Sequence, residues 1–198
     1  MALTNTQKIQ VLLESFDLLK EDFRDSSEEL QKIILQLCKM DVTLAFDMWL
    51  GLLEYAEDDL KTCAPTYGWT YDLTMGLLYE LNDIEWPCQS ARVFIDNKKL
   101  SKYVLLYSTT FNWVCSDLIG VVVNNREFEL ADRLISYLYE NKRIHEDTSF
   151  IEILQMIIDA SDECRGDDGA YSLFQSWIDR IDDKKDKAKL NAYLMTVA

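Results

Sequence analysis

The chain contains few residues that interrupt helices. Only 6 glycines and 2 prolines occur among its 198 residues. Segments of alternating apolar and polar residues, which half-buried β-strands require, are missing between the turn signals. These absences exclude a β-rich architecture and predict an all-α fold. With 48% hydrophobic residues, a chain of this length can bury a continuous core without disulfides or metals.

Among residues that commonly act in catalysis or metal binding, histidine is the scarcest in this chain. The single histidine, His145, excludes the metal-binding motifs that need two histidines. The 5 cysteines, at positions 38, 63, 88, 115 and 164, lack zinc-ligand spacing, and a thiol nucleophile would have only His145 as its base. Glycine-rich phosphate loops are also missing. We therefore predict no catalytic residues, no metal and no cofactor, and we expect a protein that is not an enzyme.

Long hydrophobic runs are absent as well. No apolar run approaches the roughly 20 residues that a helix needs to cross a bilayer, and residues 1–6 carry neither the basic stretch nor the apolar core of a secretory signal. An odd number of cysteines, several of them within apolar helical runs, is typical of a reducing compartment. The expectation is a cytoplasmic protein that does not engage membranes.

Positive charge is in short supply, with 20 Lys and Arg against 35 Asp and Glu and a net charge of −15. Residues 1–60 carry 13 acidic and 5 basic side chains, and residues 145–183 carry 11 and 2, whereas residues 84–144 are nearly neutral. Both acidic flanks should repel phosphates and attract basic surfaces. We therefore expect no direct binding to nucleic acid, and a protein partner with a basic surface.

What the chain does have is a helical pattern centred on alanine, which occurs three times. Apolar residues stand three, four, seven and eight positions after Ala45, Ala131 and Ala170, and a carboxylate stands nine positions after each. These offsets predict an apolar stripe on one side of each helix and an exposed carboxylate on another. The stripes are Met48, Trp49, Leu52 and Leu53, then Leu134, Ile135, Leu138 and Tyr139, then Leu173, Phe174, Trp177 and Ile178, and the carboxylates are Glu54, Glu140 and Asp179.

Each of these helices follows another with the same offsets, counted from Leu30, Phe111 and Phe150. The unit is therefore a helix pair, with a period of about 40 residues. This pattern resembles the α-solenoid class, closer in period to HEAT than to tetratricopeptide repeats, although no signature of a specific family accompanies it. The resemblance implies about 9–10 helices in a right-handed array of stacked antiparallel pairs, in a single domain over residues 1–198. The alternative fold is an irregular α-helical bundle.

Helix starts are marked by two capping boxes. Thr4 with Gln7 predicts a helix over about residues 5–23, and Ser26 with Glu29 predicts the start of a second helix. A short run at 89–95 is either a degenerate copy of the alanine pattern, with Ala91 in the small-residue position, or a separate short helix. Pro65 and Gly68 indicate a loop over 61–68. Further helices are predicted over about residues 41–57, 69–83, 100–123, 131–141 and 148–161 and from 184 onward, with 100–123 the most buried.

The acidic turn over residues 162–169 invites comparison with a calcium-binding loop. Cys164 and Gly166 would occupy positions that need oxygen ligands, so the EF-hand pattern is absent. Asp167 and Asp168 instead favour the start of the following helix, where carboxylates meet the positive end of the helix dipole.

Aromatic residues gather in the nearly neutral middle of the chain, among them Trp69, Trp86 and Trp113. Two interpretations stay open. The rings pack the core and the seams between helices, or they line an exposed face that anchors a partner.

These patterns favour a non-enzymatic protein-interaction module or adaptor with an acidic surface. One alternative is an acidic inhibitor, of the immunity or antitoxin kind, that blocks the basic site of a nucleic-acid enzyme. A second alternative is a helical protein that binds a small ligand between its helices. The candidate partner-binding residues are Glu57, Asp58, Asp59, Trp69, Trp86, Asp162, Glu163, Asp167, Asp168, Asp182 and Asp183.

Overall fold

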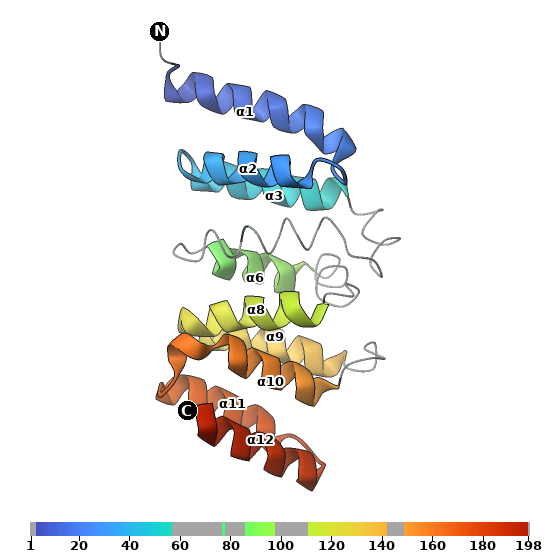
Figure 1. Ribbon diagram of the computed structural model, residues 1–198, viewed down its shortest axis with the longest axis vertical. Helices are drawn as coiled ribbons and strands as arrows, with labels where there is room; N and C mark the ends of the chain where they lie inside the picture. Colours follow the sequence, from blue (N-terminus) through green and yellow to red (C-terminus); the bar gives the residue numbers. More distant parts are fainter. Residues whose placement is uncertain (1–2, 57–76, 78–85, 98–110, 142–148, 198) are drawn as a thin grey trace. The chain divides into compact units, whose positions relative to one another are not determined.

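The computed structural model describes residues 3–56, 77, 86–97, 111–141 and 149–197. All regular structure within these ranges is helical, which confirms the predicted all-α fold (Figure 1). The α-helices are α1 (Asn5–Leu19), α2 (Ser27–Cys38), α3 (Val42–Tyr55), α6 (Trp86–Asp96), α8 (Phe111–Asn124), α9 (Phe128–Glu140), α10 (Phe150–Ala160), α11 (Asp168–Asp179) and α12 (Lys184–Val197). Two 3-10 turns, η1 (Lys20–Asp22) and η4 (Asp162–Cys164), accompany them. The predicted loop over 61–68 and helix over 69–83 lie outside the described residues, Leu77 excepted.

The chain divides into two compact units. The first is Met1–Trp86 with Tyr107–Thr109, and the second is Pro87–Leu106 with Thr110–Ala198. The single domain over residues 1–198 and the right-handed solenoid array both concern the chain as a whole, and both remain predictions.

In the first unit, α1 packs against α2, and α2 packs against α3. The turn Lys39–Asp41 between α2 and α3 is so short that the two helices run antiparallel. Their facing stripes form the core, in which Leu30, Ile34, Leu37, Ala45, Trp49, Leu52 and Leu53 are all buried. The predicted helix pair is therefore present here.

In the second unit, α8 packs against α9 and α10, α11 packs against α9 and α12, and α10 packs against α12 (Figure 1). Phe128, at the start of α9, lies against Gly169, at the start of α11. The rings of Tyr139 and Trp177, near the ends of the same two helices, are 5.6 Å apart. Helices α9 and α11 thus run side by side in the same direction.

The structure confirms that the alanines of the predicted pattern are buried. Ala45, Ala131 and Ala170 are all buried, and so is Ala91 in the short helix α6. The carboxylates Glu54, Glu140 and Asp179 are exposed, as predicted. The small side chain lets neighbouring helices approach closely, and the flanking stripes bury on both sides.

One of the two predicted capping boxes forms. The Thr4 side chain accepts from the Gln7 amide, and Gln7 accepts from the Thr4 amide, which confirms the first box. The Ser26 prediction is wrong, because Ser26 makes no side-chain cap. Its ψ is 16°, against 162° at Thr4, and only the extended conformation aims a hydroxyl at the free amides. Ser149 with Glu152 forms a capping box that was not predicted.

Candidate functional site

Five of the candidate partner-binding residues precede the second unit, and none of them forms an exposed binding face among the described residues. Glu57, Asp58, Asp59 and Trp69 lie outside the described residues. Trp86 is 1% exposed, with its ring 5.0 Å from Phe46 and 5.9 Å from Trp49. Its prediction as a partner-binding residue is therefore corrected. Trp86 belongs to the core, because an indole surrounded by aromatic rings has no surface left for a partner.

The six acidic candidates of the second unit fall into two groups. Asp162, Glu163 and Asp167 lie in the connection between α10 and α11 and Asp168 begins α11, whereas Asp182 and Asp183 precede α12. The two groups are separated by α11, whose 12 residues span about 18 Å. The structure thus places them at opposite ends of one helix and not in a single patch.

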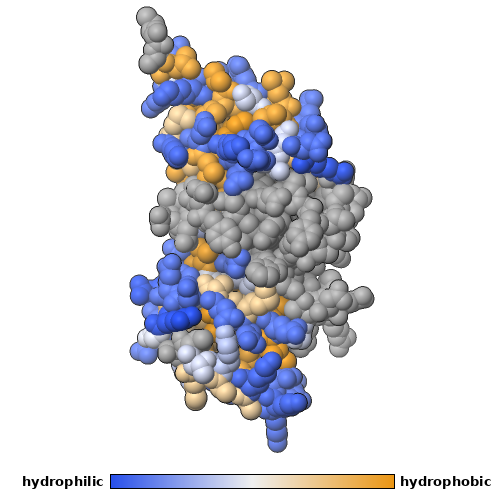
Figure 2. Space-filling view, in the orientation of Figure 1, coloured by the Kyte–Doolittle hydropathy of each residue, from blue (hydrophilic) through white to orange (hydrophobic). Residues whose placement is uncertain are grey.

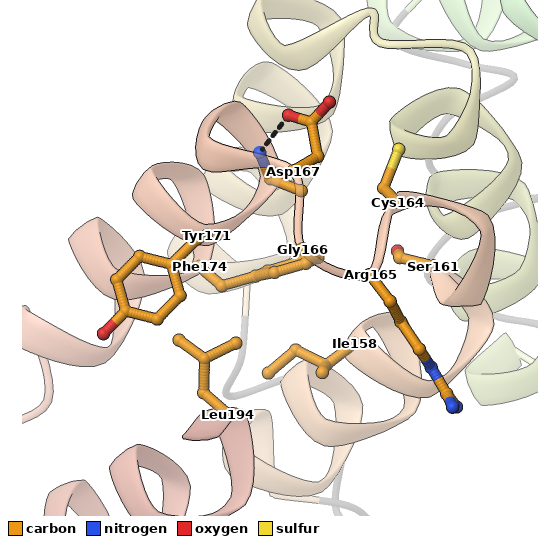
Figure 3. Close-up of a pocket in the computed structure, with 10 residues that line it drawn as sticks. Ile158, Ser161, Cys164, Arg165, Gly166, Asp167, Tyr171, Phe174 and Leu194 are labelled. Carbon is orange, nitrogen blue, oxygen red and sulfur yellow. Dashed lines mark hydrogen bonds between the residues drawn. The ribbon is translucent and has the colours of Figure 1, made fainter. Parts of the chain in front are cut away.

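The carboxylate of Asp167 is used within the protein as a helix cap and in an ion pair. Its carboxylate accepts from the backbone amide of Gly169 at 2.8 Å and from that of Ala170 at 3.3 Å (Figure 3), and so caps α11. The other oxygen accepts from Arg126 Nε at 3.1 Å. The Arg126 guanidinium and then the two amides hold the pKa of Asp167 below its ordinary value. The predicted capping role is confirmed for this residue.

Asp183 is a second cap. Its carboxylate accepts from the backbone amides of Lys185 at 2.9 Å and Asp186 at 3.0 Å. It therefore satisfies amides at the start of α12 that would otherwise lack a partner. The signal for this role was present in the sequence, since an aspartate directly before a helix is a common N-cap.

Asp162, Glu163, Asp168 and Asp182 remain available for a partner. All four are exposed. Within the part of the chain that the structure describes, their carboxylates form neither ion pairs nor side-chain hydrogen bonds. We call Asp162, Glu163 and Asp168, which lie between the end of α10 and the first residue of α11, the acidic turn.

Hydrogen bonds and an ion pair hold the segment that carries the acidic turn in place. Cys164 Sγ lies 3.2 Å from the carbonyl oxygen of Val123, and Asn124 Nδ2 donates to the carbonyl of Ala160 at 3.1 Å. With the Arg126–Asp167 ion pair, these bonds fix the α10–α11 connection to the α8–α9 connection. Burial, followed by the charge of Asp167, raises the pKa of the Cys164 thiol. That thiol is therefore a protonated packing group at neutral pH.

A small cavity lies beneath this connection (Figure 3). Ile158, Phe174 and Leu194 line its apolar side, and Arg165 extends away from them. Its volume is about 20 Å³, which admits a water molecule and little more. It does not accommodate a small organic ligand.

A shallow depression lies between α6 and α9, with a volume of about 260 Å³. Two of its charged residues have partners within the protein. Asp132 accepts from Trp177 Nε1 at 2.9 Å, and Arg133 pairs with Asp96 at 2.5 Å. The depression is open to solvent, and its one basic residue, Arg133, is held in the ion pair with Asp96, so it does not assemble an acid and base pair for catalysis.

No group of three or more His, Cys, Asp or Glu residues with metal-binding geometry occurs among the described residues. Within those same ranges, each helix is too short or too polar to cross a bilayer. Comparison with protein-family models, with curated proteins and with solved structures finds no match to this chain.

Proposed function

We propose that the chain is a non-enzymatic protein-interaction module whose acidic turn, together with Asp182, binds a protein partner with a basic surface. The observation that carries the proposal is the four exposed carboxylates, Asp162, Glu163, Asp168 and Asp182, which have no ion pair within the described structure. The carboxylates beside them, Asp167 and Asp183, are used as helix caps. The fold therefore accounts for two of the six and leaves four for another molecule.

The bonds that hold the acidic turn in place favour a role of its carboxylates in binding over a role in solubility alone. A partner pays less ordering entropy when the groups it meets are already fixed. The acidic turn is held by hydrogen bonds from Cys164 and Asn124 and by the ion pair of Asp167. Such an arrangement also steers a basic partner during encounter, because like-signed charges add their fields.

The experiment is affinity capture from a cell extract. The purified chain is immobilised, the extract is applied at low ionic strength, and bound proteins are eluted by a salt gradient. The test variant carries Asp162→Asn, Glu163→Gln, Asp168→Asn and Asp182→Asn. The matched control carries Asp25→Asn, Asp47→Asn, Glu54→Gln and Glu129→Gln, which are exposed residues and give the same change in net charge.

The proposal expects one stoichiometric protein to bind the wild type and the control and to be lost from the test variant. Equal capture by the two variants would contradict it, as would recovery of chaperones alone. If the captured partner is a nucleic-acid enzyme whose activity the chain suppresses, the module is an inhibitor of the kind considered above.

A further inference from the structure

The outer face of α1 exposes large apolar side chains to solvent. Leu18 is 77% exposed, Leu3 52% and Val11 50%. Val11 and Leu18 are seven residues apart and so lie on the same side of the helix. Figure 2 shows hydrophobic patches among hydrophilic residues over this end of the first unit. Phe16 is the buried residue of α1, so the side chains that hold the helix in place lie on a different face.

Acidic side chains accompany these apolar residues. Glu14 is exposed between Val11 and Leu18, and Glu21 is exposed in the following 3-10 turn. Neither carboxylate forms an ion pair within the described residues, although Glu14 accepts from Gln10 Nε2 at 2.8 Å. The face formed by Val11, Glu14, Leu18 and Glu21, which we call the α1 face, is therefore apolar with negative charges.

The outer face of α12 has the opposite charge. Lys185, Ala188, Lys189, Ala192 and Met195 are exposed at helical spacing, and Met195 is 73% exposed. Lys185 and Lys189 form no ion pair among the described residues, whereas Lys187 pairs with Asp179 at 2.9 Å. We call these five exposed residues the α12 face.

The inner side of α12 fixes which residues point outward. Leu190 and Leu194 are buried. The Tyr193 hydroxyl donates to Asp159 on α10, and Lys187 donates to the carbonyl of Asp179 at 3.1 Å. The α12 face is therefore presented in a defined orientation.

We propose that the α1 face of one copy of this chain docks against the α12 face of a second copy. Each face exposes a large apolar side chain, Leu18 and Met195, and the two faces carry opposite charges. Pairing Glu14 and Glu21 with Lys185 and Lys189 neutralises both, while the apolar groups are removed from water. This inference is independent of the acidic turn, which lies on other elements.

The size of the faces sets the strength of the contact. A helix of 15 residues is about 22 Å long, so one helix face covers less than the roughly 800 Å² per partner of a standard interface. The association is therefore weak and depends on salt, because exposed charges are screened within about 10 Å at 0.1 M ionic strength.

The experiment is sedimentation equilibrium of the whole chain over a range of concentrations at low and high salt. We expect the mean mass to rise above the monomer mass of 23.1 kDa at low salt and to return to it at high salt. Lys185→Glu with Lys189→Glu should weaken the association at least about tenfold. Leu18→Ala should weaken it without any change in charge.

Two further samples make the result specific. The reversal of Glu14 and Glu21 to lysine should also abolish association, and mixing this variant with the Lys185→Glu, Lys189→Glu variant should restore it, since each intact or doubly reversed face then finds a complement. A charge-matched control, Lys39→Glu with Arg133→Glu, changes two exposed cations elsewhere and should associate like the wild type. Circular dichroism and unfolding midpoints confirm that each variant is folded.

Several outcomes would overturn the inference. A chain that stays monomeric at low salt up to millimolar concentration has no such contact. Association that is sensitive to Leu18 but not to the α12 lysines would indicate pairing of two α1 faces. Failure of the mixed variants to associate would exclude the complementary pairing, and none of these results bears on partner capture through the acidic turn.

Discussion

The guanidinium of Arg126 lies 3.1 Å from the carboxylate of Asp167, although the two residues are 41 positions apart in the chain. The ion pair joins the α8–α9 connection to the α10–α11 connection. Arg126 has a φ of 60°, a left-handed conformation that non-glycine residues rarely adopt. The α10–α11 connection has its own left-handed residue, Gly166, with a φ of 77°. The two successive connections thus share a backbone feature and are tied to one another.

Replacing Asp167 with alanine should destabilise the protein, because α11 loses its N-cap and Arg126 loses its partner. Thermal unfolding at pH 7 should show a midpoint lower by a few degrees. Asp168→Ala is the control, since Asp168 lies in the first turn of α11 but does not cap it. An equal loss for the two variants would contradict the role assigned to Asp167.

The effect of Asp167 should also depend on pH. Its pKa is lowered in the folded protein, so its stabilising contribution is present above its ordinary pKa and is lost as the pH falls through the lowered value. The difference in unfolding free energy between wild type and Asp167→Ala should therefore shrink below about pH 4. A difference that stays constant from pH 7 to pH 3 would show that the charge of Asp167 does not contribute.

The same substitution at two glycines should act in opposite directions. Gly166→Ala should cost about 1–2 kcal/mol, because alanine is strained at a φ of 77°. Gly51 lies within α3 with open space around it, so Gly51→Ala should gain about 0.5–1 kcal/mol from higher helix propensity. Urea unfolding of both variants measures the two changes, and a shared sign would refute the backbone assignment.

The crossing of α8 and α10 depends on Gly120. A methyl group at Gly120 would lie 2.5 Å from the Cβ of Ala160 and 2.6 Å from its carbonyl oxygen. Gly120→Ala should therefore destabilise the protein by about 1–3 kcal/mol through overpacking. Gly51→Ala serves as the matched control for the change in helix propensity. A Gly120→Ala variant as stable as that control would mean that α8 and α10 do not approach this closely.

Buried thiols should react slowly in the folded protein. Cys38, Cys88 and Cys164 are buried, and burial raises the pKa of Cys38 to about 11. At pH 8, an aromatic disulfide reagent followed by peptide mapping should label these three sites far more slowly than in urea, because the thiolate is the reactive form. Labelling of Cys38 at the same rate in both conditions would contradict its burial.

The raised pKa of Cys38 also predicts alkaline sensitivity. The folded state favours the protonated thiol, so this contribution to stability is complete below the ordinary pKa of 9.0 and is lost as the pH rises through about 11. Urea unfolding between pH 8 and pH 11 should show a smaller decline in Cys38→Ala than in wild type. Parallel declines would remove Cys38 as the cause.

Much of the local structure could be predicted because it depends on periodicity alone. The buried positions of Ala45, Ala131 and Ala170 follow from apolar spacing, and the Thr4 cap follows from a three-residue motif. Ser26 has the same motif, but its backbone is not in the extended conformation that a side-chain cap needs, and no pattern in the sequence specifies that.

The candidate site was predictable only in part. The acidity of residues 162–168 is evident from composition, but the division of labour between Asp167, which caps a helix, and Asp162, which faces solvent, depends on where the backbone amides point. The approach of Gly120 to Ala160 and the ion pair of Arg126 are tertiary contacts between distant segments. Trp86 was misassigned because an aromatic residue has the same sequence signature in a core as on a binding face.

The central claim is that exposed carboxylates of the acidic turn, with Asp182, recognise a basic protein. Its most direct test is the dissociation constant of the captured partner for the wild type, the four-site neutralised variant and the charge-matched control, measured by calorimetry at several salt concentrations. The account predicts that neutralisation weakens binding at least about tenfold and flattens its salt dependence, while the control binds like the wild type. Binding that is unchanged by neutralisation, or weakened equally by the control, would contradict it.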